Sequence, residues 1–334
     1  MKNNRISILY ISGHHAHEKL CQSVSNKRYF IPNRNENWIT YLLKIFLLSM
    51  KIPDCDVVVS ESHAGKLVAL ALRKFLLRKN FICIVRANDH FFNFDAFPWY
   101  KRIFVKFISR YIDGVIAISD MVMHYVKKNT NLPVRKVNTF VEKDFLDIKP
   151  NLTGRNIVSI GTYFPRKGND ILMEIDKKLR KKGWGGYTFI LGPIEIVPKF
   201  ILEYSKLQPK FRFVGVVDPK RYFEKCCFYV HPSRFDAAGC SVLEAMGAGL
   251  IPIVSKNTGN KEIVEQVDKT LIVDNKPICF YKKISELLNE DEERLKELSV
   301  LCKKVAEKYV FEKVQKEFIK NFEKILNEVR HNKN

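Results

Sequence analysis

Short apolar runs alternate with longer stretches of helical spacing through the first 150 residues of the chain. We expect strands at five of these runs: 6–11, 56–60, 81–86, 114–118 and 137–141. Apolar residues that recur every three or four positions predict helices between them, at about 37–50, 64–78, 98–112 and 120–129. Short, mostly apolar strands separated by helices are typical of a parallel sheet covered on both faces. The first half is therefore predicted to be one α/β domain.

The same pattern begins again after a polar connector around residues 147–155, which places a domain boundary near residue 150. The strands predicted in this half are 156–161, 187–192, 211–214, 227–231 and 250–255, and the first helices are 169–182 and about 219–225. Residues 283–330 are strongly helical and amphipathic. The chain is thus predicted to contain a second α/β domain.

The most informative segment covers residues 231–264, HPSRFDAAGCSVLEAMGAGLIPIVSKNTGNKEIV. Its loop 236–240 carries no bulky side chain, so backbone N–H groups there can approach a ligand closely. The short helix that follows, about 241–247, presents its positive dipole end to the same loop, which favours an anion. Asp236 precedes this helix and Glu244 lies about two turns further on, and carboxylates suit hydroxyl groups better than phosphate. A phosphate beside several hydroxyls describes a nucleotide-sugar.

This segment resembles the donor site of the group 1 retaining glycosyltransferases (glycosyltransferase family 4). The matching positions are Ser233, Glu244, Ala245, Met246, Gly249 and Pro252. Asp236 departs from the pattern, because the family has glutamate there. The resemblance implies an α/β protein of GT-B architecture, with two Rossmann-like domains facing across an inter-domain cleft. Residues 1–150 would form the acceptor domain and residues 151–312 the nucleotide-sugar donor domain, with a terminal helix at about 313–330 crossing back to the first domain.

The resemblance also implies roles for the residues around the donor. Asp236 would hold the hydroxyls of the transferred sugar, and Glu244 would hold those of the ribose. Lys167 matches the family's Lys-Gly turn and would stabilise the leaving diphosphate, although a solvated basic turn is the alternative. Thr162 stands where the family usually has an arginine. The contact of that arginine with the diphosphate is therefore either missing here or supplied by Arg166. Further donor contacts are expected at Ala238, Gly239, Cys240, Ser241, Gly192 and Gly215; for the last two, simple strand-ending turns explain the glycines equally well.

Signals in the first domain are weaker. The loop that touches donor phosphate in this family would be residues 12–17, which hold one glycine, Gly13, and three histidines. Three histidines suggest a metal, but no carboxylates accompany them, and the resemblance implies a transferase that needs no metal or other cofactor. The family's sugar-facing histidine has two candidate catalytic positions here: His63, which is alternatively an ordinary helix-start residue, and Arg86, which stands where a histidine is expected.

Composition also indicates the cellular compartment of the protein and the class of its binding partner. The chain of 334 residues is 46% hydrophobic and 28% charged, as in a globular protein. No secretion signal or membrane-spanning run is recognisable, and the eight cysteines show no metal or redox spacing, so we expect a reducing cytoplasm. The net charge of +21 suits an anionic partner. An apolar stretch at 38–50 and a basic amphipathic one at 99–110 favour a membrane surface over nucleic acid, although either helix alone could instead pack in the core.

These features predict a retaining hexosyltransferase that moves a sugar from a nucleotide-sugar to a glycan or polyprenyl-linked acceptor. We expect it in cell-surface polysaccharide or glycoconjugate synthesis, peripheral on the cytoplasmic face of the membrane. Two alternatives stay open. One is a different GT-B enzyme, such as a nucleotide-sugar epimerase. The other is a non-catalytic basic protein that binds membrane or nucleic acid, which the departures at Asp236 and Thr162 would suit.

Overall fold

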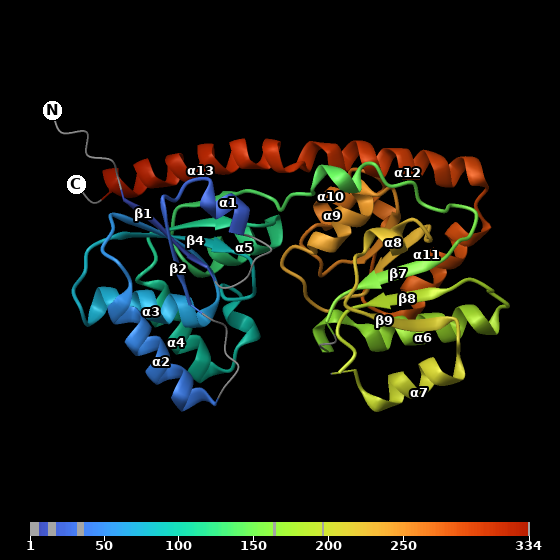
Figure 1. Ribbon diagram of the computed structural model, residues 1–334, viewed down its shortest axis with the longest axis horizontal. Helices are drawn as coiled ribbons and strands as arrows, with labels where there is room; N and C mark the ends of the chain where they lie inside the picture. The colour runs from blue at the N-terminus through green and yellow to red at the C-terminus, as the bar shows by residue number, and fades with distance from the viewer. Residues whose placement is uncertain (1–6, 13–17, 32–36, 163–164, 196, 333–334) are drawn as a thin grey trace. The chain divides into compact units, whose positions relative to one another are not determined.

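The computed structural model of the chain describes residues 7–12, 18–31, 37–162, 165–195 and 197–332 (Figure 1). It divides into two compact units. The first comprises Met1–Thr139 with Glu312–Asn334, and the second comprises Phe140–Phe311. The division after residue 139 lies slightly before the polar connector at 147–155.

The first unit contains a parallel sheet with the strand order β2-β1-β3-β4-β5-β6. Its strands are β1 (Ile8–Ser12), β2 (Lys27–Phe30), β3 (Val57–Glu61), β4 (Ile82–Ala87), β5 (Gly114–Ala117) and β6 (Val134–Lys136). Its helices are α1 (Glu18–Gln22), α2 (Trp38–Lys51), α3 (Ala64–Phe75), α4 (Trp99–Ser109), α5 (Asp120–Asn129) and most of α13 (Phe311–His331). Figure 1 shows α2, α3 and α4 on one side of this sheet and α1 with α13 on the other.

Two strands of this sheet differ from the prediction. β2 has the sequence Lys-Arg-Tyr-Phe and lies at the sheet edge with three of its four residues exposed, so it lacks the apolar run that would reveal it. β6 lies just before the apolar run predicted at 137–141. Val141 is buried in the second unit instead, where it forms an isolated bridge to Val310.

The second unit contains a parallel sheet with the order β12-β11-β10-β7-β8-β9. Its strands are β7 (Ile157–Ile160), β8 (Thr188–Leu191), β9 (Phe211–Gly215), β10 (Phe228–His231), β11 (Ile251–Ser255) and β12 (Ile272–Val273). Its helices are α6 (Asn169–Lys181), α7 (Lys199–Leu207), α8 (Lys220–Phe223), α9 (Cys240–Gly247), α10 (Lys261–Val264), α11 (Pro277–Asn289) and α12 (Glu292–Ala306). β10 and β11 are fully buried because helices cover both faces, α9 packing with α12 and α6 with α11.

The helical stretch predicted at 283–330 is interrupted twice. Asp291 begins α12 by accepting a hydrogen bond from the Arg294 amide at 2.7 Å, which ends α11 just before it. Val310 is extended and separates α12 from α13. α13 then presents an apolar stripe to the first unit, with Phe318 and Ile325 fully buried.

Candidate functional site

The site residues expected in the second unit gather where β7, β8, β9 and β10 end. These strands are adjacent and parallel, so the loops that follow them share one edge of the sheet. The loop after β7 carries Thr162, Arg166 and Lys167. The loop after β10 carries Asp236, and α9, which follows it, carries Glu244.

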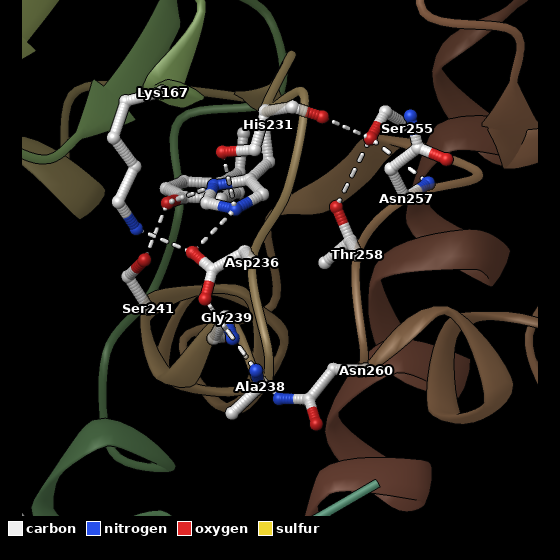
Figure 2. A network of polar contacts seen from close by, with 12 residues as sticks. Lys167, His231, Asp236, Ala238, Gly239, Ser241, Ser255, Asn257, Thr258 and Asn260 are labelled. Carbon is white, nitrogen blue, oxygen red and sulfur yellow. Dashed lines mark hydrogen bonds and ion pairs between the residues drawn. The ribbon is translucent and has the colours of Figure 1, made fainter. Parts of the chain in front are cut away.

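Asp236 is the centre of a polar network (Figure 2). Its Oδ2 forms an ion pair with Lys167 Nζ and accepts a hydrogen bond from His231 Nε2 at 3.1 Å. Its Oδ1 accepts from the amides of Gly239 at 3.0 Å and Ala238 at 3.4 Å. Asp236 is only 9% exposed, so protein donors take up most of its acceptor capacity. The network therefore fixes the first acidic residue of the loop against both the lysine and the start of α9.

The charges of this network follow from its burial and contacts. Burial alone would raise the pKa of Asp236, but the hydrogen bond from His231 and the charge of Lys167 outweigh it and hold that pKa well below its ordinary value. Burial also lowers the pKa of His231, despite the neighbouring carboxylate. The histidine is therefore neutral near pH 7, and the network assigns its proton to Nε2, which faces Asp236. The ionised groups of this contact are Lys167 and Asp236.

The network continues to helix α9 through Tyr229 and His231, which were not predicted as site residues. The Tyr229 hydroxyl lies 3.3 Å from His231 Nδ1 and 2.6 Å from the Ser241 hydroxyl. Because Nδ1 of this neutral histidine accepts, Tyr229 donates to it and Ser241 donates to Tyr229. A chain of hydrogen bonds thus leads from Ser241 on α9, through β10, to Asp236. The sequence shows His231 as a polar residue at the end of an apolar strand, but it gives no sign of the hydrogen bond between His231 and Tyr229.

Helix α9 begins beside this network with its positive end towards the loop. Its N-cap residue is Gly239, which has a φ of 71° and supplies no side-chain cap, and Cys240, half-buried, is the first helical residue. Asn260 holds this conformation from the other side. Its amide donates to the Ala238 carbonyl at 2.8 Å, and its side chain donates to the Gly239 carbonyl at 3.1 Å. The expected anion cradle is thus a fixed loop.

The turn after β7 is held against the end of β10. Gly168 has a φ of 74°, and a Cβ there would lie 2.1 Å from the Pro232 carbonyl oxygen, so this approach requires glycine. The Arg234 amide donates to the Arg166 carbonyl at 2.6 Å. The Arg234 guanidinium also forms a bidentate ion pair with Asp170, at 2.9 and 2.6 Å. Arg166 itself is exposed, and the lysine that follows it is the basic group turned towards Asp236.

A cavity of about 250 Å³ opens where β7, β8 and β9 end. Its lining is mostly apolar and includes three of the expected residues, Thr162, Gly192 and Glu244. Gly215 ends β9 immediately before two valines that complete the lining. The cavity therefore brings Gly192 together with Glu244, the second acidic residue of the motif, and Gly215 lies next to its lining in sequence.

Glu244 has an unusual acidity in this cavity. Burial, reinforced by the nearby carboxylates of Asp144 and Glu142, raises its pKa to about 7. Glu244 is consequently divided between its protonated and ionised forms near neutral pH. In either form it can accept hydrogen bonds from hydroxyl groups, and in the protonated form it can also donate one.

The site residues expected in the first unit are less accessible. His63 is the N-cap residue of α3 without a capping hydrogen bond, and burial lowers its pKa. Arg86, in β4, is completely buried and lies over the Phe318 ring at 5.5 Å. Within the described part of the chain its guanidinium has no hydrogen-bond partner. Arg86 thus packs in the core of the first unit against α13, and its catalytic role stays a prediction. Gly13 lies outside the described residues.

None of the described His, Cys, Asp and Glu side chains form a group of three that could hold a metal ion. His14, His15 and His17, which suggested a metal in the sequence, lie outside the described ranges.

Comparison with known proteins places this site in a family context. Residues 154–290 match the family model described as glycosyl transferases group 1. An uncharacterized glycosyltransferase of Haemophilus influenzae is 27% identical over 197 residues, which cover 58% of this chain and 55% of that protein. The chain thus spans about half the length of the curated relatives it matches.

Solved structures resemble the whole chain. Sucrose-phosphate synthase from Thermosynechococcus elongatus aligns with a TM-score of 0.77 at 15% identity, over 97% of this chain and 100% of that one. Anabaena HepE in complex with UDP-glucose aligns with a TM-score of 0.74 at 13% identity, over 96% and 100%. These likenesses confirm the expected α/β fold with two Rossmann-like domains, and the family match confirms the resemblance to group 1 glycosyltransferases over residues 154–290.

Proposed function

Residues 154–290 form a group 1 glycosyltransferase domain, and on that premise we propose that the protein is a retaining glycosyltransferase that takes its sugar from a nucleotide-sugar. One observation carries the proposal. A lysine, an aspartate, an uncapped helix start and a mostly apolar cavity that includes Glu244 all lie along one edge of the second sheet. These are the groups needed to bind a diphosphate, the hydroxyls of a sugar, and a nucleoside.

The donor would lie along this edge in three parts. The nucleoside occupies the 250 Å³ cavity beside Gly192, with its ribose hydroxyls on Glu244. The diphosphate lies at the start of α9, near Gly239 and Ser241, where the helix dipole favours negative charge. The sugar reaches the Asp236 carboxylate, which accepts its hydroxyl protons.

Lys167 would change partners when the donor binds. In the present structure its ammonium is paired with Asp236, so a bound diphosphate competes for it as a second anion. When the ammonium turns to the phosphate, Asp236 gains an acceptor site for a sugar hydroxyl. The His231 and Gly239 hydrogen bonds keep the carboxylate in position while this happens.

Transfer then breaks the bond between the anomeric carbon and the diphosphate oxygen. Lys167, Arg166 and the start of α9 stabilise the negative charge that develops on that oxygen, an effect typically worth about 3 kcal/mol for one preorganised donor. The acceptor hydroxyl attacks the anomeric carbon from the face that the diphosphate leaves, so the configuration is retained. Its proton passes to the departing phosphate oxygen. The positive charge supplied by these groups underlies our expectation that no metal ion is required.

For the acceptor we propose a glycan or a polyprenyl-linked sugar of cell-surface polysaccharide or glycoconjugate synthesis, used at the cytoplasmic face of the membrane. The high positive charge of the chain suits an acceptor that carries phosphate. The non-catalytic alternative, a basic protein that binds membrane or nucleic acid, rests on the departures at Asp236 and Thr162, and it predicts that no nucleotide-sugar binds.

The test is release of nucleotide from a panel of nucleotide-sugars, beginning with UDP-glucose because a similar fold was solved with it. Asp236→Asn and Lys167→Met are expected to bind donor poorly or to lose turnover. Lys256→Met and Asp274→Asn are the matched control, since they remove an exposed 2.7 Å ion pair from the same unit. Donor binding without release, with or without acceptor, would contradict the transferase proposal. No binding of any nucleotide-sugar would also contradict it and would favour the non-catalytic alternative.

A further inference from the structure

Three helices of the first unit expose an unusual amount of apolar surface. Its largest contributors are Trp99, 74% exposed, and Leu43 and Ile103, each 62% exposed. We call this region the α2–α4 surface. Its exposed apolar residues are Leu43, Phe46, Leu47, Met50, Phe75, Leu76, Leu77, Trp99, Tyr100, Ile103, Phe104 and Phe107. Surfaces of this kind mark sites of interaction with a protein or a membrane.

The helices of the α2–α4 surface contact one another in sequence order. α2 packs along α3, and the Phe75 ring at the end of α3 meets the Phe107 ring of α4 edge-on at 6.2 Å. Figure 1 shows the three helices together on one side of the first sheet. The exposed apolar residues thus belong to three neighbouring helices on the same side of the sheet, and Phe75 and Phe107 join those of α3 to those of α4.

Helix α4 packs in the core by one side, as the core-packing alternative for residues 99–110 expects, but its aromatic residues lie outside that side. Its buried residues are Val105, Ile108 and Ser109. Phe104 and Phe107 are instead 49% and 41% exposed. A helix that turned its aromatic residues to the core would show the opposite pattern.

The charged residues of these three helices are all basic, and two exposed aspartates of neighbouring segments pair with them, Asp54 with Arg73 and Asp95 with Arg102. Helices α2, α3 and α4 contain no aspartate or glutamate. Lys44, Lys101 and Lys106 are exposed among the apolar residues, and Arg110 follows α4 directly. The neighbouring Asp95 is already paired with Lys128 at 2.6 Å. The surface is thus apolar at its centre and basic around it.

We propose that the α2–α4 surface docks on an anionic lipid bilayer. The aromatic and aliphatic side chains would enter the interface, and the lysines would meet the lipid phosphates. A second copy of the chain is a poorer occupant, because it would bring two basic faces together. No helix among the described residues is long and apolar enough to cross a membrane. The inference rests on the proposed function in one respect: a lipid-linked acceptor would reach the protein at this surface.

The test is co-sedimentation of the whole protein with vesicles of phosphatidylcholine, alone or mixed with phosphatidylglycerol. Lys101→Glu with Lys106→Glu is expected to weaken binding to the anionic vesicles on the order of 100-fold, since each basic residue near the surface contributes separately. Ile103→Ser with Phe104→Ser is expected to weaken binding to the same vesicles. Matched controls are Lys181→Glu with Lys182→Glu at the end of α6, and Phe200→Ser with Leu207→Ser on α7, all exposed in the second unit.

The proposal is supported if the wild type and both controls bind anionic vesicles, added salt weakens that binding, and both surface variants lose it. It is overturned if the wild type ignores anionic vesicles, if the surface variants bind as the controls do, or if those variants only dissociate a dimer. Circular dichroism and nucleotide-sugar binding by each variant show that the protein is folded. Since the donor groups lie in the second unit, failure of docking with donor binding intact leaves the sugar-transfer proposal standing.

Discussion

Replacing Glu244 with glutamine is expected to stabilise the protein at alkaline pH and to have a much smaller effect at acid pH. A carboxyl whose pKa is higher in the folded protein keeps a proton that the unfolded chain releases. For Glu244 the pKa is raised from 4.5 to about 7, mainly by burial. Its cost to stability therefore grows as the pH rises from 4.5 to about 7 and is complete above that. Glutamine resembles the protonated acid and carries no such cost.

The size of the effect follows from the same shift. A pKa raised from 4.5 to about 7 corresponds to roughly 3 kcal/mol once the group is fully ionised. Glu244 is partly exposed at the cavity wall, so we take about 2 kcal/mol as the effective value. In a unit of this size, 2 kcal/mol changes the unfolding midpoint by about 4–8 °C.

The assay is thermal unfolding of wild type and Glu244→Gln without donor, at pH 5 and pH 8. At pH 8 the unfolding midpoint of the variant is expected to be several degrees higher than that of wild type. At pH 5 the two midpoints are expected to be nearly equal. Glu265→Gln, an exposed glutamate of the same unit, is the control for removing one negative charge. An equal difference at both pH values, or a variant that melts lower at pH 8, would refute the reasoning.

Three further predictions concern the donor loop. Lys167→Met should lower kcat by about 100- to 1,000-fold, because the charge that stabilises the leaving diphosphate is gone. Steady-state kinetics in the presence and absence of EDTA measure this loss. A change in kcat of less than threefold would contradict the prediction. His231→Phe should raise KM for the donor about tenfold by removing a hydrogen bond to the Asp236 region, whereas His231→Gln, which can still donate, should restore part of it. Gly168→Ala should lower the unfolding midpoint far more than Gly183→Ala. Both glycines have a positive φ, but only Gly168 lies against backbone, at the Pro232 carbonyl. Equal losses would show that the close approach of Gly168 to Pro232 does not require glycine.

Much of the fold could be predicted because both sheets are parallel and buried. A strand covered on both faces must be apolar throughout, so β3, β4, β10 and β11 appear in the sequence as short apolar runs. β2 could not be found this way, since an edge strand with exposed side chains follows no such pattern. The exposure of Phe107 was also hidden, because an amphipathic pattern does not show which side of a helix meets the core.

The candidate site was predictable in its composition and not in its contacts. Asp236 and Glu244 stand out because small residues separate them at the start of a helix. The pairing of Asp236 with Lys167 joins loops 69 residues apart, and no local pattern reports it. The bidentate pair of Arg234 and Asp170 bridges 64 residues and escaped notice for the same reason.

The packing of α13 has a consequence for the order in which the domains can form during synthesis. Ile325 lies so close to β5 that a Cβ at Gly114 would be 2.4 Å from it, and Phe318 covers the buried Arg86. The sheet of the first unit therefore waits for a segment that is translated only after the whole second unit, before one of its faces is closed. The second domain contains all of its own strands and can fold earlier. Until α13 emerges, the nascent chain has an open apolar face that a chaperone could protect.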